Sequence, residues 1–267
     1  MEIKMLATDL DGTLLPTGSR VPEENIAAVQ RAVKAGVVVT IATGRMFRAA
    51  LPVAEAIGAS VPIITYNGAL IKSVDGHVYA AHYLPEDVVR AALDFCRARG
   101  WYVQLYADDV LYFAEHTAES AGYEAEQQIK GETVGWDGLY AHTAHVAKLL
   151  SISSGAEETD VRIKELGAHL AGRADVVRSN PKYAEIVSHG VSKAAALTQL
   201  AGLLHIPMEN VMAIGDSNND LPMLRAAGHS VAMGNALPEV KEACEFLTGD
   251  CEKGGFAEAV EKFVLGA

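Results

Sequence analysis

Two aspartates near the beginning of the chain, Asp9 and Asp11, have the types and the spacing that catalysis uses. They follow an apolar run that fits a strand buried on both faces. An extended chain would point both carboxylates to the same side, where they repel unless a cation or a shared proton separates them. This pattern predicts Asp9 as nucleophile and metal ligand and Asp11 as general acid and base. The alternative is a strand that ends in an ordinary turn at Gly12.

Three further polar clusters lie where secondary structure is expected to change. One follows a strand expected over residues 37–41, one begins a helix after Ser192, and one follows a strand expected over residues 210–214. Because ligands bind at the carboxyl ends of parallel strands, we expect these clusters to meet at one edge of a sheet. Each cluster alone is more often structural, so their joint order carries the signal. The clusters are Thr43, Gly44 and Arg45; Lys193; and Asp216, Asn219 and Asp220.

Alternating apolar segments predict the elements that would position these residues. The first part of the chain alternates strand and helix, and this order implies a parallel sheet with right-handed crossovers. Pro22 with two acids after it is typical of a helix start, and Gly36 of a helix end. Strands are expected over residues 4–8, 37–41 and 61–65, helices over residues 22–35 and 46–57, and a polar turn over residues 14–20.

The middle of the chain has a different pattern. Hairpin-like strand pairs and helices occur between Ala69 and Val187 without regular alternation, which favours an inserted α+β module. The doubly wound pattern resumes after Ser192. We therefore predict an α/β protein with a Rossmann-like doubly wound parallel sheet as its core and an inserted α+β cap. The core would comprise residues 1–83 and 188–267, and the cap residues 84–187.

Composition restricts the partners that this chain could bind. Its 267 residues carry a net charge of −12, which argues against nucleic acid because phosphate backbones need a basic surface. A small phosphorylated metabolite needs only a few local cations. Cys96, Cys244 and Cys251 have no paired spacing, which favours reduced thiols in the cytoplasm. No apolar run approaches the roughly 20 residues that span a membrane, so we expect no membrane partner.

Taken together, the clusters resemble the motifs of the haloacid dehalogenase superfamily of aspartyl phosphohydrolases. The similarity is greatest to its Cof-like sugar-phosphatase branch, whose cap is inserted at the same place. One difference is Ala194, where many relatives have glycine after the lysine. The matching segments are Asp9-Leu10-Asp11-Gly12-Thr13, Ala42-Thr43-Gly44-Arg45, Tyr66-Asn67-Gly68, Glu185-Ile186, Lys193 and Gly215-Asp216-Ser217-Asn218-Asn219-Asp220.

The resemblance implies a role for each motif residue. Asp9 would attack phosphorus and form an aspartyl-phosphate, Asp11 would move the proton, and Lys193 would balance negative charge. Mg²⁺ would be held by the carboxylates of Asp9 and Asp216 and by the main-chain carbonyl of Asp11. Substrate contacts are implied for Thr43, Gly44, Arg45, Lys193 and Asn219, and supporting roles for Thr13, Asn67 and Asp220.

The implied activity is Mg²⁺-dependent hydrolysis of small phosphorylated metabolites, with sugar phosphates as the expected substrates. A phosphomutase of the same fold is one alternative, because it forms a similar aspartyl-phosphate but returns the phosphoryl group to the sugar. A non-catalytic regulator that binds phosphosugars is the other. The enzyme is expected to be cytoplasmic and to act as a monomer or a small homo-oligomer.

Overall fold

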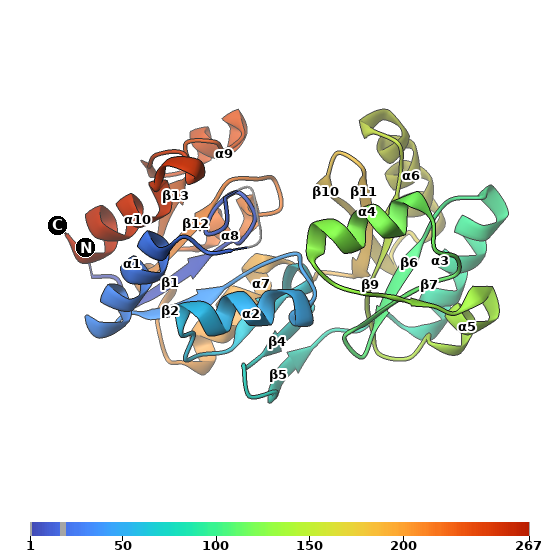
Figure 1. Cartoon of the computed structure of the whole chain (residues 1–267), viewed down its shortest axis with the longest axis horizontal. Helices are drawn as coiled ribbons and strands as arrows, with labels where there is room; N and C mark the ends of the chain where they lie inside the picture. Colours follow the sequence, from blue (N-terminus) through green and yellow to red (C-terminus); the bar gives the residue numbers. More distant parts are fainter. Residues whose placement is uncertain (1, 17–19, 267) are drawn as a thin grey trace. The chain divides into compact units, whose positions relative to one another are not determined.

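The computed structural model describes residues 2–16 and 20–266, so the middle of the turn expected over residues 14–20 lies outside it. The described chain forms two compact units, whose elements Figure 1 labels. The core unit contains the residues up to Ala80 and those from Ser192 onward. The inserted unit runs from Ala81 to Val191. Each unit is described below by itself.

A five-stranded parallel sheet forms the centre of the core unit. Its spatial order is β14 (Phe246–Leu247), β13 (His229–Ala232), β12 (Val211–Gly215), β1 (Met5–Thr8) and β2 (Val38–Ile41). Strands from the two ends of the sequence thus lie side by side (Figure 1), with Thr8 of β1 opposite Ile214 of β12. Every residue of β1 is buried, as the apolar run predicts. The carboxyl ends of all five strands face one edge, where a site can form.

The third expected strand belongs to a separate sheet, formed by β3 (Ile63–Thr65), β4 (Leu70–Lys72) and β5 (Val78–Ala81). The predicted strand is present, and the bridge described between it and the parallel sheet is itself parallel. Within the described residues, β3 meets the parallel sheet through a single bridge between Ala42 and Ile64. Tyr66 and Asn67 have positive φ angles of 53° and 55° and turn the chain directly after β3. The chain then folds back as β4, which pairs antiparallel with β3.

Helices flank the parallel sheet, as the doubly wound pattern predicts. They are α1 (Glu23–Lys34), α2 (Phe47–Ile57), α7 (Lys193–Leu203), α8 (Leu221–Ala226), α9 (Pro238–Ala243) and α10 (Gly255–Ala259). The last helix, α10, is α-helical from Gly255 to Ala259 and continues as a π-helix from Val260 to Leu265. In the part of the chain that the structure describes, no helix is both long enough and apolar enough to cross a membrane.

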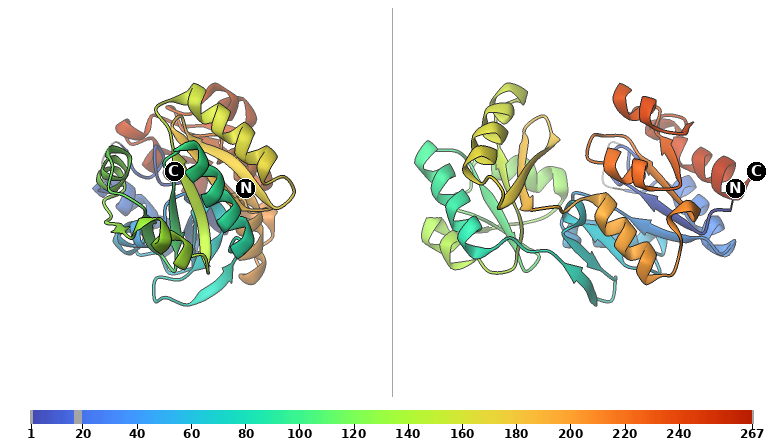
Figure 2. Two further views of the ribbon diagram at one scale, coloured as in Figure 1. Left: turned by 90° about the vertical axis from the view of Figure 1, so that its right-hand side faces the viewer. Right: turned by 180° about the vertical axis from the view of Figure 1, so that it is seen from behind.

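The inserted unit is built on a six-stranded sheet, which Figure 2 shows from two further directions. Its spatial order is β10 (Ala174–Asn180), β11 (Tyr183–Ser188), β9 (Val146–Ile152), β6 (Gln104–Ala107), β7 (Val110–Phe113) and β8 (Glu132–Thr133). Its helices are α3 (Glu86–Arg99), α4 (Ala118–Gln127), α5 (Gly135–Ala141) and α6 (Ala156–His169). The sequence did not predict β8 and α5, which are too short to establish a period.

Alternating residues give the two faces of this sheet different chemistry. One face contributes Leu105, Leu149 and Ile186 to a hydrophobic cluster that also contains residues of α3 and α6. On the other face, Lys148 and Glu185 form a buried ion pair, so this face holds a polar group inside the unit. The inserted unit therefore has its own hydrophobic core.

Candidate active site

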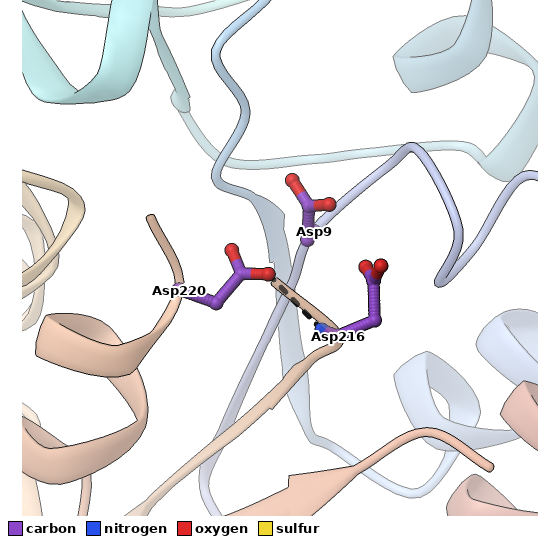
Figure 3. Close-up of side chains that lie close together, drawn as sticks. All are labelled: Asp9, Asp216 and Asp220. Atoms are coloured by element: carbon purple, nitrogen blue, oxygen red, sulfur yellow. Dashed lines mark hydrogen bonds between the residues drawn. The ribbon is translucent and has the colours of Figure 1, made fainter. Parts of the chain in front are cut away.

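The carboxyl ends of β1 and β12 place two acids beside each other. Asp9 follows β1 and Asp216 follows β12, and the backbone N–H of Asp9 donates to the carbonyl of Ile214 at 3.0 Å. Figure 3 shows the two carboxylates close together with that of Asp220. Gly12 has a φ of +77°, and a Cβ there would lie 2.6 Å from Oδ2 of Asp216. Because Gly12 has no side chain, the chain can turn here and pass close to the carboxylate of Asp216.

Lys193 connects two of these acids. It is the first residue of α7, whose N-cap Ser192 accepts a hydrogen bond from the N–H of Ala195. Its Nζ donates to Oδ1 of Asp9 and to Oδ1 of Asp220, both at 2.6 Å. Burial acts to lower the pKa of Lys193, but the carboxylates of Asp220 and Asp9 raise it above its ordinary value. The buried lysine is therefore charged at neutral pH.

Asp220 organises the loop between β12 and α8. Its Oδ2 accepts hydrogen bonds from the N–H groups of Asp216 and Ser217, both at 3.0 Å, and its Oδ1 accepts from Lys193. Figure 3 marks the bond to Asp216. Asn219 donates to Oδ1 of Asn67 at 3.2 Å, which joins this loop to the turn after β3. Both oxygens of Asp220 are thus engaged by protein donors.

Negative charge accumulates at this edge of the sheet. Burial, and then the charge of Asp220, hold the pKa of Asp9 well above its ordinary value, although Lys193 lowers it. Burial and Asp220 also raise the pKa of Asp216 to about 7. With Asp11, the site contains four carboxyl groups, and the two cations beside them are Lys193 and Arg45. With all four ionised, these six residues would therefore lack two positive charges.

Arg45 lies against Asp11. Its Nε donates to Oδ2 of Asp11 at 2.9 Å and its Nη2 donates to Oδ1 at 2.5 Å. The side chain of Arg45 is 7% exposed, whereas that of Asp11 is 54% exposed. The sequence predicted Arg45 as a substrate contact. In the structure its guanidinium pairs with the carboxylate of Asp11.

The loop after β2 is fixed against the turn after β3. The N–H of Arg45 donates to Oγ1 of Thr43 at 3.1 Å, and the N–H of Asn67 donates to the carbonyl of Thr43 at 2.9 Å. A Cβ on Gly44 would lie 3.0 Å from Oδ1 of Asn67, so a larger residue would press on this turn. Gly68 lies against α7, because a Cβ there would be 2.3 Å from the carbonyl oxygen of Ser192. Thr43, Gly44 and Asn67 therefore form one packed corner.

Thr13 also contacts the site. Its fully buried hydroxyl donates to Oδ1 of Asp216 at 2.9 Å. The resemblance implied a supporting role for Thr13, and the structure places its hydroxyl on the carboxylate of Asp216.

Asn235 is a site residue that the sequence analysis missed. Its Nδ2 donates to the carbonyl of Gly12 at 2.8 Å, and its Oδ1 accepts from the N–H of Cys251 at 2.9 Å. It therefore ties the turn that carries Asp11 to the C-terminal part of the core unit. Asn235 follows β13, so the rule that selected the other strand-end clusters could have found it.

The oxygen ligands present are suited to a metal ion. Asp9, Asp216 and Asp220 each place a carboxylate oxygen within 4.8 Å of the others. The protein donors described above already occupy both oxygens of Asp220. Within residues 2–16 and 20–266, Oδ2 of Asp9 and Oδ2 of Asp216 accept no hydrogen bond. These two acids are therefore the ones that could hold a cation, while Asp220 orients its neighbours.

Known proteins are similar to this chain over almost its whole length. Residues 6–260 match the family of haloacid dehalogenase-like hydrolases. A Bacillus subtilis 5-amino-6-(5-phospho-D-ribitylamino)uracil phosphatase, YcsE, is 30% identical, over 99% of this chain and 97% of the relative. A haloacid dehalogenase-like hydrolase from Bacteroides thetaiotaomicron has a TM-score of 0.89 at 29% identity, covering 98% and 99% of the two chains. The subclass IIB sugar phosphatase BT4131 has a TM-score of 0.85 at 25% identity, covering 97% and 98%.

The chain belongs to the haloacid dehalogenase-like hydrolases. Within this superfamily it falls in the Cof-like branch, as its motifs predicted. The predicted enzyme class, a phosphoric monoester hydrolase, is confirmed by the same comparisons, and so is the predicted α/β fold.

Proposed function

We propose that this enzyme is a Mg²⁺-dependent phosphatase that hydrolyses small sugar phosphates through an aspartyl-phosphate on Asp9. The observation that carries the proposal is the hydrogen bonding of the two oxygens of the Asp9 carboxylate. Lys193 holds its Oδ1 at 2.6 Å inside the protein, while no described residue donates to its Oδ2. A nucleophile that must be fixed and also reach a substrate needs this combination.

In the first step, Asp9 would attack phosphorus while the bond from phosphorus to the alcohol oxygen breaks. Asp11 would give its proton to that oxygen, so that the alcohol leaves as a neutral molecule. Thr43 and the amide of Gly44 would hydrogen-bond the phosphoryl oxygens, and Lys193 would offset their charge.

In the second step, Asp11 would take a proton from water as the water oxygen attacks the phosphorus of the aspartyl-phosphate. The bond from phosphorus to Asp9 then breaks, which releases inorganic phosphate and restores the carboxylate. Dividing one difficult displacement into two easier ones is the advantage of the covalent route.

The residues present fit Mg²⁺, because carboxylate oxygens are the ligands that this hard cation prefers. Asp9 and Asp216 would hold it, together with the main-chain carbonyl of Asp11. The bound ion would supply Lewis-acid stabilisation of the phosphoryl oxygens. The deficit of two positive charges supports a divalent cation, since a phosphate dianion would otherwise enter a site that is already negative.

Sugar phosphates are the proposed substrates because two relatives act on related esters. YcsE is named for a substrate that contains a phosphorylated ribityl group, and BT4131 is named a sugar phosphatase. Residues 84–187, proposed as a cap domain, would select among such substrates. The free thiols of Cys96, Cys244 and Cys251 support a cytoplasmic location.

Release of inorganic phosphate from a panel of sugar phosphates, FMN and pyridoxal phosphate tests the proposal. With Mg²⁺, we expect turnover of at least one sugar phosphate, which EDTA abolishes and added Mg²⁺ restores. Asp9→Asn should lower kcat by about 10³-fold or more, because it removes the nucleophile. Asp137→Asn, at an exposed site in α5, should leave the rate unchanged. Full activity in Asp9→Asn, or turnover that EDTA does not affect, would contradict the proposal.

A further inference from the structure

The ion pair between Arg45 and Asp11 uses both oxygens of the proposed acid and base. Two separate N–H groups of the guanidinium donate to the two oxygens, at 2.9 Å and 2.5 Å. A guanidinium presents its N–H groups in a fixed planar fork that matches a carboxyl group. The direction of the Asp11 carboxyl is therefore set by a planar, two-pronged contact.

Arg45 is the fixed partner of this pair. Its backbone N–H donates to Thr43, and its carbonyl accepts from the N–H of Tyr66 at 2.9 Å. The guanidinium is almost fully buried. Asp11 is half exposed and precedes Gly12, whose backbone is in the left-handed region. The backbone of Arg45 is thus held at both its N–H and its carbonyl group, whereas the side chain of Asp11 stays half exposed.

We propose that Arg45 is a positioning residue that acts through Asp11 and does not bind the substrate's phosphoryl group. The guanidinium keeps the Asp11 carboxyl aimed at the leaving oxygen, to which Asp11 delivers its proton as the bond from phosphorus to that oxygen breaks. Asp11 recovers a proton from the water that attacks the aspartyl-phosphate. This inference rests on the proposed phosphatase function and adds a role for Arg45 to it.

Esters with different leaving groups separate the two possible roles of Arg45. An alkyl alcohol, such as that of a sugar, needs a proton in order to leave, whereas p-nitrophenolate leaves as a stabilised anion. The measured quantity is kcat/KM, because it reports the steps up to release of the alcohol. We expect Arg45→Met to lower kcat/KM by about 10²-fold for the fastest sugar phosphate, within the usual contribution of general acid catalysis. For p-nitrophenyl phosphate we expect a loss of less than about fivefold.

A double-mutant cycle tests whether the effect passes through Asp11. In an Asp11→Asn background, Arg45→Met should change kcat/KM for the sugar phosphate by less than about twofold. Arg45→Lys keeps the charge but loses the two-pronged geometry, so it should give a smaller loss of the same kind. It also carries the test if thermal unfolding shows that Arg45→Met does not fold. Arg225→Met, an exposed arginine of α8, is the matched control and should not change the ratio between the two esters.

The contrary results are distinct from a failure of the proposed function. Equal losses for both esters, with weaker inhibition by inorganic phosphate, would show that Arg45 binds the phosphoryl group and would overturn the inference. An undiminished effect of Arg45→Met in the Asp11→Asn background would overturn it as well. If the wild-type enzyme released phosphate from neither ester, the proposed function itself would fail.

Discussion

The hydroxyl of Thr13 determines how the Asp216 carboxylate is presented. It donates to Oδ1 at 2.9 Å from a fully buried position, which directs Oδ2 away from this contact. Gly12 passes close to the same Oδ2 because it lacks a side chain. When a group that orients a metal ligand in this way is removed, metal affinity or activity commonly falls by about 10- to 100-fold.

Replacing Thr13 by valine should therefore weaken the use of Mg²⁺. The change keeps the shape of the side chain and removes the hydroxyl, so the Mg²⁺ concentration that gives half-maximal phosphate release should rise about tenfold. Thr13→Ser retains the hydroxyl and is the matched control, with an expected change of less than about twofold. A Mg²⁺ titration that does not distinguish valine from the wild type would show that Thr13 serves the turn alone.

At the scale of elements, a buried ion pair joins two strands of the inserted unit. Nζ of Lys148 in β9 donates to Oε1 of Glu185 in β11 at 2.9 Å, and the hydroxyl of Ser179 donates to the same oxygen at 2.7 Å. Burial acts to lower the pKa of Lys148, but the charge of Glu185 raises it above its ordinary value. Removal of one partner would leave a buried charge without its counterion, which is strongly destabilising.

Lys148→Met should lower the free energy of unfolding by about 3–5 kcal/mol, because Glu185 then lacks its cation. The double variant Lys148→Met with Glu185→Leu should recover most of this loss, since no isolated charge remains. Lys182→Met, at an exposed site before β11, should change stability by less than about 0.5 kcal/mol. Urea unfolding measures all three. Equal stability of Lys148→Met and the wild type would refute a stabilising contribution of this pair.

For the whole molecule, the limits of sequence reasoning have physical causes. The ends of buried parallel strands can be predicted from sequence, because the strands are apolar and polar residues follow their carboxyl ends. Asp9 and Asp216 were found in this way. The contact from Arg45 to Asp11 was not predictable, because a long side chain can reach many partners from the same backbone position. Asn235 was missed because its two partners, the carbonyl of Gly12 and the N–H of Cys251, are backbone groups that leave no pattern in the sequence. The antiparallel pairing of β3 with β4 was not predicted for the same reason.

The site residues all belong to the core unit, although they come from both ends of the chain. The inserted unit has its own hydrophobic cluster and contributes none of the motif residues that meet at Asp9. Chemistry and substrate selection are therefore proposed to reside in different units. Under this proposal the covalent step depends on Asp9, Lys193 and their neighbours alone, and it should be the same for every substrate that the enzyme accepts.

Trapping the phosphorylated enzyme tests the central claim most directly. The enzyme is mixed with its fastest sugar phosphate and Mg²⁺, quenched, and treated with borohydride, which reduces an aspartyl-phosphate to homoserine. Trypsin then releases the peptide from Met5 to Arg20, which contains both aspartates, for sequencing by mass spectrometry. The account predicts homoserine at position 9 only when substrate is present. Modification at position 11, or an unmodified position 9 in an enzyme that is turning over, would contradict it.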